Sequence, residues 1–234
     1  MTLLRRLGKA LAWALGTLAA AFVVVQTWFL LHIAYWAKFD PQRTSFMERR
    51  LDELRVRNPK AEIRHQWADY ARISVHLKRA VIAAEDAKFI DHEGFDWEGI
   101  QRALERNQQR GRVVAGGSTI SQQLAKNLFL SGERSVLRKG QEALITVMLE
   151  AVMEKRRILE IYLNVAEWGE GVFGAEAAAR HYFGAGAASL SPGQAARLAA
   201  MLPRPRYYDR NRGSAYLERY SERILARMPS VQVP

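Results

Sequence analysis

The longest apolar stretch of the chain lies close to its N-terminus. The 28 residues between Lys9 and Lys38 include no Asp, Glu, Lys or Arg. As a helix this stretch would rise about 42 Å, more than the roughly 30 Å thickness of a membrane hydrocarbon core. Polar side chains from Gln26 onward interrupt the apolar run late, so the effective span is 11–31. The pattern therefore predicts a transmembrane anchor within residues 1–37.

A cleaved signal peptide is the alternative explanation of this stretch. The apolar run is longer than that of a typical signal peptide, and no clear small-residue cleavage site follows it. Aromatic residues gather near its far end, as they do at a membrane interface, at Trp28, Phe29, Tyr35 and Trp36. We therefore expect a permanent anchor. Lysines and arginines lie on both sides of it, so the positive-inside rule leaves its orientation open.

Beyond the anchor, polar and apolar positions recur with the spacing of helices. Residues 38–70 carry mixed charge and are interpreted as a juxtamembrane segment, partly helical around residues 46–56. From about Ile73 onward helical patterns dominate, in stretches over residues 77–84, 120–130 and 136–162. No sustained two-residue alternation indicates a sheet. We predict a mostly α fold, with one domain over residues 71–228.

One later helix carries explicit signals at both ends. Ser191 is placed as its N-cap, followed by a proline and, at the third helical position, by Gln194. The helix is expected to end before Pro203. Tyr207 and Tyr208 follow among arginines, a composition that also occurs in nucleic-acid-binding segments. A loop packing on the domain is the interpretation we favour, and we expect no nucleic-acid partner.

Composition and charge narrow the classes of function. A hydrophobic content of 49% supports a sizeable core, and the absence of cysteine excludes disulfides, zinc–thiolate sites and thiol nucleophiles. The 35 Lys and Arg residues against 24 Asp and Glu give a formal net charge of +11. This excess indicates a polyanionic neighbour, which charge alone leaves open between nucleic acid, anionic lipid headgroups and a phosphorylated substrate.

The first segment with candidate chemistry is EDAKFIDHEGFD at 85–96, directly after an apolar helical stretch. Glu85 stands at the end of that stretch, where partial desolvation would disfavour its charged form. Desolvation of this kind turns a carboxylate into a usable proton acceptor or donor near neutral pH. The alternative is a solvated acid at a helix end, with Asp86 beside it, and spacing alone favours that alternative.

The second segment is GGSTISQQLAKN at 116–127. The two glycines allow a turn, after which Ser118 or Thr119 can cap a helix, with Thr119 and Gln122 in capping-box spacing. Backbone N–H groups at such an N-terminus suit an anion, and Lys126 lies one turn beyond Gln122. An ordinary capped helix without a ligand explains the same residues. The segment lacks the spacing of a Walker P-loop.

The third segment is ERSVLRKGQE at 133–142. Arg138 and Lys139 precede Glu142 by four and three residues, so both reach its carboxylate on a helical surface, and Arg134 adds a charge one turn earlier. Pairs of this kind are also common solvated contacts of small energetic consequence. Together with Lys126, these cations would suit a diphosphate leaving group, and two carboxylates in contrasting environments would suit glycosyl transfer.

At these residues the sequence resembles the biosynthetic peptidoglycan glycosyltransferases of the monofunctional, membrane-anchored kind. The resemblance covers roughly residues 75–208 and consists of several long motifs in the same order. They are EDAKFIDHEGFD, GGSTISQQLAKNLFL, RKGQEA, ILEIYLNVAEWGEGVFGAEAAARHYF and SLSPGQAARLAAMLPRP. The resemblance implies a lysozyme-like helical domain with a smaller lobe near the bilayer. It departs from the usual motifs at Ser121 and Gly132.

What the resemblance implies for the reaction is an inverting transfer that turns lipid II into β-1,4-linked glycan and releases undecaprenyl diphosphate. Glu85 is implied as the general base for the acceptor 4-hydroxyl, and Glu142 as the residue that assists departure of the diphosphate. The implied positions for binding the substrate are Ser118, Gln123, Lys126, Asn127, Arg134, Arg138 and Lys139. Asp86 and His92 are implied in supporting roles.

The resemblance also implies partners and a location. A lipid-tethered substrate is met at the membrane surface, which implies a cytoplasmic tail within 1–37 and a catalytic domain on the periplasmic side of the bacterial inner membrane. The implied partners are lipid II, the growing lipid-linked glycan and other cell-wall synthesis or division proteins. Bifunctional relatives carry a transpeptidase domain with an S-x-x-K motif, which is absent from this sequence, so we expect no transpeptidase activity.

No cofactor is expected to be required. The five histidines show no metal-ligand spacing such as H-E-x-x-H, although a divalent cation such as Mg²⁺ could bridge the diphosphate to the protein. Two other functions use the same residues. A lytic muramidase would need one catalytic glutamate but not the cations around the second. A non-enzymatic cell-wall scaffold would not need the intact set of Glu85, Glu142 and Lys139.

Overall fold

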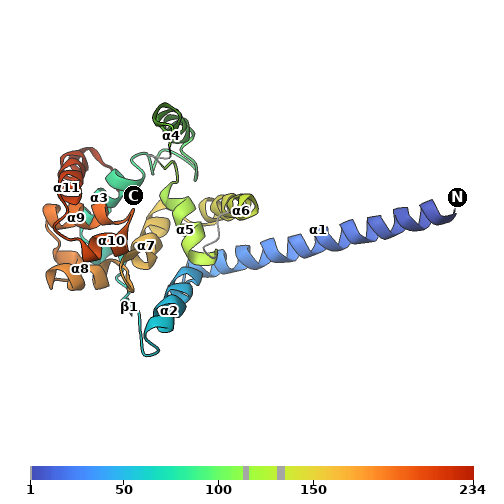
Figure 1. Ribbon diagram of the computed structural model, residues 1–234, viewed down its shortest axis with the longest axis horizontal. Helices are drawn as coiled ribbons and strands as arrows, with labels where there is room; N and C mark the ends of the chain where they lie inside the picture. Colours follow the sequence, from blue (N-terminus) through green and yellow to red (C-terminus); the bar gives the residue numbers. More distant parts are fainter. Residues whose placement is uncertain (1, 113–115, 131–134) are drawn as a thin grey trace.

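The computed structural model describes residues 2–112, 116–130 and 135–234. A single long helix, α1 (Thr2–Trp36), extends away from a helical domain and carries the N-terminus at its far end (Figure 1). Within the described ranges, α1 is the helix long and apolar enough to cross a membrane, over Arg5–Trp36. The predicted anchor is therefore a continuous helix, as expected from its 28 uncharged residues.

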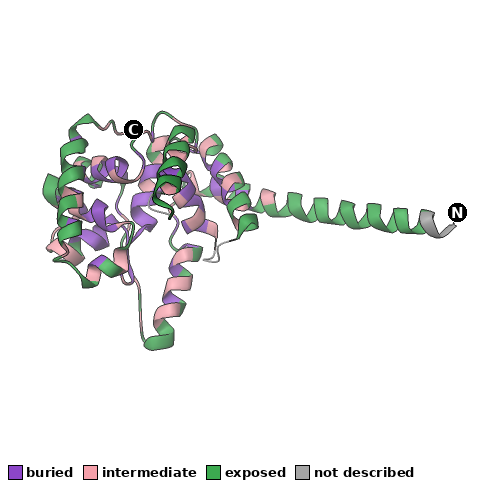
Figure 2. Ribbon diagram, turned by 45° about the horizontal axis from the view of Figure 1, so that its top comes forward, coloured by how far each residue is buried: buried purple, intermediate pink, exposed green. Residues whose placement is uncertain are grey.

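The two ends of α1 differ in their surroundings. Residues 5–25 of α1 are exposed (Figure 2), whereas Phe29 and Ile33 near its C-terminal end are buried against the domain. Phe129 of the domain packs edge-on against Phe29, with ring centroids 5.1 Å apart. Gln26 and Gln141 exchange two side-chain amide hydrogen bonds of 3.0 Å each. The anchor is thus packed onto the domain rather than linked to it by a flexible tether.

The remaining described helices form the domain. Their bounds are α2 (Ser45–Arg57), α3 (Val75–Glu85), α4 (Trp97–Arg110), α5 (Ile120–Phe129), α6 (Val136–Val152), α7 (Lys155–Val165), α8 (Ala175–Phe183), α9 (Pro192–Met201), α10 (Pro205–Arg210) and α11 (Ala215–Arg227). Three short 3-10 turns complete them, η1 (Tyr70–Arg72), η2 (Ala187–Ser189) and η3 (Met228–Ser230). The mostly α prediction is confirmed.

A three-stranded sheet, which the sequence pattern did not indicate, lies within this helical domain. It consists of β1 (Arg64–His65), β2 (Glu167–Gly169) and β3 (Val172–Phe173) in the order β1-β3-β2. β1 runs parallel to β3, and β2 runs antiparallel to it. Strands of two or three residues are too short to show an alternating pattern, which explains why they were missed. β1 ties the segment before α3 to the centre of the domain.

The helix predicted over residues 136–162 is two helices, and this expectation was wrong. Met153 and Glu154 have extended backbone angles between α6 and α7, and the buried side chain of Met153 fills the corner. No glycine or proline marks the break. α5 packs against both α6 and α7, so the break is imposed by tertiary packing on a sequence that is helical in pattern throughout.

The later helix α9 matches its prediction in detail. Ser191 accepts from the Gln194 backbone, the Gln194 side chain accepts from Ser191 in return, and the proline between them occupies the first turn. The segment after Pro203, expected to be a loop, instead forms the short helix α10. Pro205 begins α10, where its missing N–H costs nothing, and Tyr208 is buried.

The core lies between α3, α9 and α11 on one side and α5, α7 and α8 on the other, and its buried residues appear mainly inside the domain (Figure 2). Trp168, Tyr162, Phe89 and Phe173 are its largest fully buried side chains. Asn164 in α7 is also fully buried, and it exchanges hydrogen bonds of 2.8 and 2.9 Å with the backbone of Ala68. These bonds fix the chain before α3 against α7.

Candidate active site

Glu85 is the last residue of α3, whose apolar face is buried in the core. Ser74 caps the start of this helix by accepting from the backbone N–H of His76. The Glu85 side chain is half-buried, and its Oε2 accepts a 2.7 Å hydrogen bond from Nε2 of Gln123 on α5. Burial raises the pKa of Glu85 above its usual value, opposed by this hydrogen bond and by Lys126. Glu85 is therefore partly desolvated, whereas spacing alone favoured a solvated acid at this position.

Gln123 is held in place from its other side. The hydroxyl of Tyr162 donates a 3.0 Å hydrogen bond to Oε1 of Gln123, which turns the amide nitrogen toward Glu85. Tyr162 is buried in α7, and burial raises the pKa of its phenol well above the usual value, so it stays a donor at neutral pH. Sequence reasoning missed Tyr162 because a tyrosine at an apolar helical position is indistinguishable from a core residue.

Asp86 and His92 form hydrogen bonds next to the contact between Glu85 and Gln123. The buried carboxylate of Asp86 contacts Nε2 of His92 at 2.9 Å and accepts from the backbone N–H of Ile120 at 3.0 Å. Asp86 therefore joins the end of α3 to the start of α5. The loop between them needs the positive φ of Gly94, where an added Cβ would lie 2.8 Å from a methyl group of Thr146.

The start of α5 is capped by Thr119, one of the two residues that the sequence left open. Thr119 and Gln122 form the predicted capping box. Ser118 lies instead beside Glu85 in the lining of a small pocket of about 160 Å³. Because Asp86 and Thr119 already accept from the first backbone N–H groups of α5, those groups are less available to an anion than the sequence suggested.

Glu142 lies in the second turn of α6 and is only 3% exposed. Nη1 of Arg138 contacts its carboxylate at 3.1 Å, and Nζ of Lys139 forms a second ion pair with it. Both predicted pairs are therefore present, and the buried carboxylate is matched by two cations. Arg134, the other cation predicted here, lies outside the described residues.

Lys126 lies on α5, the helix that contacts Glu85 through Gln123 and packs against α6. It is half-buried in α5 one turn after Gln123, and the described residues place no carboxylate within ion-pair distance of it. Burial lowers the pKa of Lys126, while the negative charges of Glu142 and Glu85 both act to raise it. The region around Lys126 on α5 therefore lies next to the helices that carry both glutamates, because Gln123 on α5 bonds to Glu85 and α5 packs against α6.

That region opens into a cleft of about 720 Å³, within the range of ligand sites. Of the predicted residues, the cleft is lined by Gln123, Lys126, Asn127 and Arg138. The described lining does not include Glu142 or Lys139, nor Glu85, which lines the smaller pocket together with Ser118. Asp86 lines the smaller pocket beside Glu85 and is also hydrogen-bonded to His92, which lines neither pocket.

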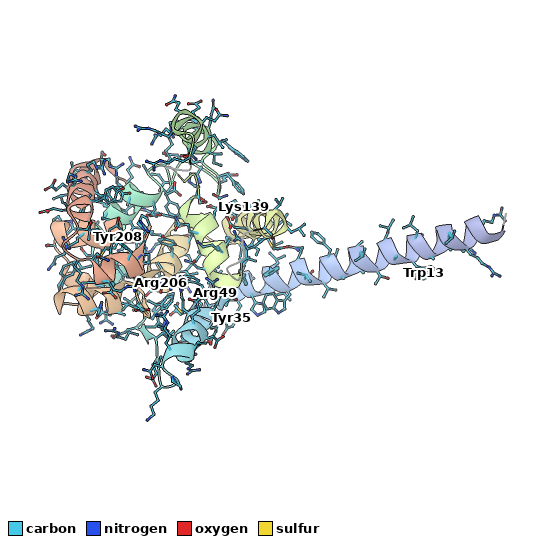
Figure 3. The ribbon with its side chains drawn as sticks, viewed as in Figure 1. Trp13, Tyr35, Arg49, Lys139, Arg206 and Tyr208 are labelled. Atoms are coloured by element: carbon cyan, nitrogen blue, oxygen red, sulfur yellow. The ribbon has the colours of Figure 1, made fainter. Side chains whose placement is uncertain are left out.

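The opposite side of the cleft carries residues that sequence reasoning did not assign to a site. They are Phe46, Arg49 and Arg50 of α2, Glu167 of β2, and Arg204, Arg206, Tyr207 and Arg210 in and before α10. Figure 3 shows Arg49 and Arg206 with the side chains around them. The arginine pair at 49–50 and the arginines around Pro205 were visible as charge clusters. Their convergence depends on the tertiary fold.

Among the described residues, no group of three or more His, Asp or Glu side chains is arranged to hold a metal ion. The histidines have other partners. His92 contacts Asp86, and His181 contacts Oδ1 of Asp209 at 3.0 Å. His65 lies against the backbone oxygen of Asn164 at 3.1 Å, and burial lowers the pKa of its imidazole.

A helical domain, a long apolar helix and a cleft lined by cations next to two glutamates are features of a membrane-associated enzyme. The model of the family described as "Transglycosylase" matches residues 52–229, and the chain belongs to this family. It is 60% identical to the "Biosynthetic peptidoglycan transglycosylase" of Dechloromonas aromatica (strain RCB) over 97% of this chain and 99% of the relative. A second protein of that name, from Aromatoleum aromaticum, is 60% identical over 100% of this chain and 99% of its own length.

The protein from Laribacter hongkongensis (strain HLHK9) with the same name is 59% identical over 97% of this chain. The family and these near full-length relatives support a peptidoglycan transglycosylase, and hence a glycosyltransferase. The long apolar helix is consistent with a single-pass inner-membrane protein.

Proposed function

We propose that the enzyme polymerises lipid II into β-1,4-linked glycan strands and releases undecaprenyl diphosphate. The observation that carries this proposal is Lys126, a half-buried cation that lines the same cleft as Gln123, the partner of Glu85, and Arg138, the partner of Glu142. A glycan cleaver has no diphosphate leaving group and no use for this concentration of positive charge. A polymerase that expels a diphosphate needs it.

In the proposed step, the Glu85 carboxylate takes the proton of the acceptor 4-hydroxyl. The oxygen then attacks the anomeric carbon of the lipid-linked donor from the face opposite the diphosphate. The new C–O bond forms as the bond to the diphosphate breaks, and the diphosphate leaves with the electron pair, so the anomeric configuration inverts. The raised pKa of Glu85 suits a base that works near neutral pH.

The second carboxylate is proposed to act through its cations. Glu142 holds Arg138 and Lys139 by ion pairs, and Arg138 reaches the cleft lining together with Lys126. Positioned cations stabilise the charge that develops on the departing diphosphate. We assign Ser118, Gln123 and Asn127 to contacts with the sugars, and include Arg134 among the diphosphate-binding cations because of its place in the motif.

The domain is proposed to face the periplasm, and the chain to have no transpeptidase activity. The anchor packs directly on α6 and so keeps the site close to the membrane surface, where a lipid-linked substrate lies. Because the sequence contains no cysteine, a single cysteine at exposed Lys60 would report orientation. In intact cells a membrane-impermeant maleimide should label Lys60→Cys. Labelling only after lysis would place the domain in the cytoplasm.

We propose that no resident metal ion is required, because protein cations supply the positive charge at the leaving group. Mg²⁺ would act only by screening the diphosphate. Polymerisation by the purified enzyme should therefore persist in EDTA. Complete loss in EDTA, with recovery on adding Mg²⁺, would show that the protein cations do not suffice.

The decisive experiment is polymerisation by the detergent-solubilised full chain. Fluorescent lipid II is incubated with the protein, and the products are separated by size before and after muramidase digestion. We expect chains longer than one disaccharide that muramidase degrades, with no crosslinked material. If lipid II is consumed without polymer, or preformed glycan is shortened, the polymerase assignment is wrong.

A further inference from the structure

The cleft has a second cationic side, separate from the residues assigned to the diphosphate. We call it the arginine wall and define it as Arg49, Arg50, Arg204, Arg206 and Arg210. Two of its members come from α2 and three from α10 and the residue before it. The catalytic step proposed above uses none of these side chains.

The arginine wall carries more positive charge than its neighbours neutralise. Nη1 of Arg50 contacts Glu53 at 2.5 Å and its Nε contacts Glu167 at 3.0 Å, and Arg206 lies 3.6 Å from Glu53. Arg49 reaches Glu53 only at 4.0 Å. Within the described residues Arg204 and Arg210 have no ion pair. Five arginines against two carboxylates leave a formal excess of three positive charges, which suits an anionic ligand.

Two buried atoms, one in the wall and one beside it, lack hydrogen-bond partners among the described residues. They are Oε1 of Glu167 and Nε of Arg49, and both residues line the cleft. Glu167 is only 6% exposed, and burial raises the pKa of its carboxyl group. Because an unpaired buried polar atom is costly, a nearly buried carboxyl with one free oxygen indicates a ligand that completes it. A ligand with both amide groups and carboxylates could donate an amide hydrogen bond to Glu167 and place its carboxylates against the arginines.

The α10 part of the wall, Arg204, Arg206 and Arg210, lies away from the anchor, whereas Arg49 and Arg50 lie on α2, which follows the anchor in the chain. α6, with Glu142 and its two cations, packs against the anchor helix, whereas α10 packs against β2 and α9. Figure 3 shows Lys139 nearer the anchor and Arg206 farther along the domain. A diphosphate attached to a membrane lipid is constrained to the anchor side. What reaches Arg204, Arg206 and Arg210 is therefore a part of the substrate that projects away from the membrane.

We propose that the arginine wall binds the carboxylates of the peptide that peptidoglycan sugars carry, with Glu167 hydrogen-bonded to a peptide amide. This inference rests on the proposed function, because it assigns a further part of the same substrate. All five cations are arginines, whose planar guanidinium groups match carboxylates in a bidentate manner. The ligand class is an acidic peptide borne on the glycan, and the wall is a specificity-determining subsite.

The test compares Arg206→Gln and Arg210→Gln with the control Arg219→Gln, an exposed arginine of α11 outside the cleft lining. Each full-length variant is assayed with two forms of lipid II, one with free peptide carboxylates and one with those carboxylates amidated. We expect each wall variant to raise KM for the free-carboxylate form about tenfold, the size of one charge-assisted hydrogen bond. The amidated substrate should be affected less than twofold, with kcat nearly unchanged for both.

Three other outcomes would overturn the inference. An equal rise in KM for both substrates would mean that the wall binds the diphosphate or the sugar. No difference between wall variants and Arg219→Gln would mean that the wall binds no substrate. Equal KM of the unmodified protein for both substrates would exclude a carboxylate subsite. In all three cases polymerisation continues, whereas failure of the proposed function would appear as no polymer from either substrate.

Discussion

Glu85 and Glu142, the two glutamates near Lys126, differ in burial and in the groups that they contact. Glu85 is half-buried at the end of α3, accepts a hydrogen bond from the neutral amide of Gln123, and has a raised pKa. Glu142 is almost fully buried within α6 and is matched by Arg138 and Lys139. A desolvated carboxylate with a neutral partner can exchange a proton near neutral pH. A carboxylate held between two cations is better suited to positioning charge.

The helices that carry these glutamates also differ in what they pack against. α3 lies against α9 and α11, deep in the domain, whereas α6 lies against the anchor helix. Gln141, the neighbour of Glu142, exchanges hydrogen bonds with Gln26 of the anchor. The proposed base is thus held by the domain core, and the proposed diphosphate end is held partly by the membrane helix. Substitutions should separate these two halves of the site.

The largest effect is expected from Glu85→Gln. Removing the proton acceptor should lower kcat for lipid II polymerisation by at least about 100-fold, the usual contribution of a general base. Thermal unfolding should be nearly unchanged, because glutamine keeps the shape of the side chain and accepts a hydrogen bond from Gln123. A variant that retains near wild-type activity would show that another group takes the proton.

The site around Glu142 is tested at Lys139, the more exposed of its two paired cations. Lys139→Ala should raise KM for the lipid-linked donor by about tenfold, because one of the cations at the leaving group is lost. Lys60→Ala is the control, since Lys60 is exposed and outside the cleft lining. Steady-state kinetics at matched ionic strength compare the two. Similar behaviour of both variants would remove the case for a diphosphate site at α6.

Gln123→Leu tests the pKa of the base directly. Because Glu85 must be ionised to act, activity falls as the pH drops through its raised pKa. The hydrogen bond from Gln123 holds that pKa down, so its loss should raise the pKa further and move the acidic limb of the kcat/KM profile to higher pH. We expect a several-fold loss at about pH 6 and a smaller one at about pH 8. An unshifted acidic limb would assign that limb to another group.

The smallest effect is expected at the anchor. Gln26→Leu removes the amide pair with Gln141 and should destabilise the packed state by about 1 kcal/mol, in the range found for polar contacts in membranes. KM for the donor should rise by about twofold, while the acidic limb set by Glu85 stays in place. Kinetics and thermal unfolding in detergent, with Thr17→Leu on the exposed part of α1 as control, measure both. A shift of the acidic limb would mean that the anchor also supports α3.

Much of the local structure could be predicted from the sequence. The anchor followed from 28 residues without Asp, Glu, Lys or Arg, and the capping boxes at Thr119 and Ser191 followed from spacing alone. These features depend on residues within a few positions of each other, where helix geometry determines which side chains are in contact. The ion pairs of Glu142 with Arg138 and Lys139 were predictable for the same reason.

Only the tertiary structure decided the rest. It ended α6 at Val152 without a glycine or proline, because α5 packs against the helices on both sides of the break. It brought Tyr162 to Gln123 and buried Glu85, although spacing alone favoured a solvated acid at that position. It also placed Arg49 and Arg50 of α2 in the lining of the same cleft as Lys126. Contacts between residues tens of positions apart depend on how helices pack, and no local pattern along the chain encodes that choice.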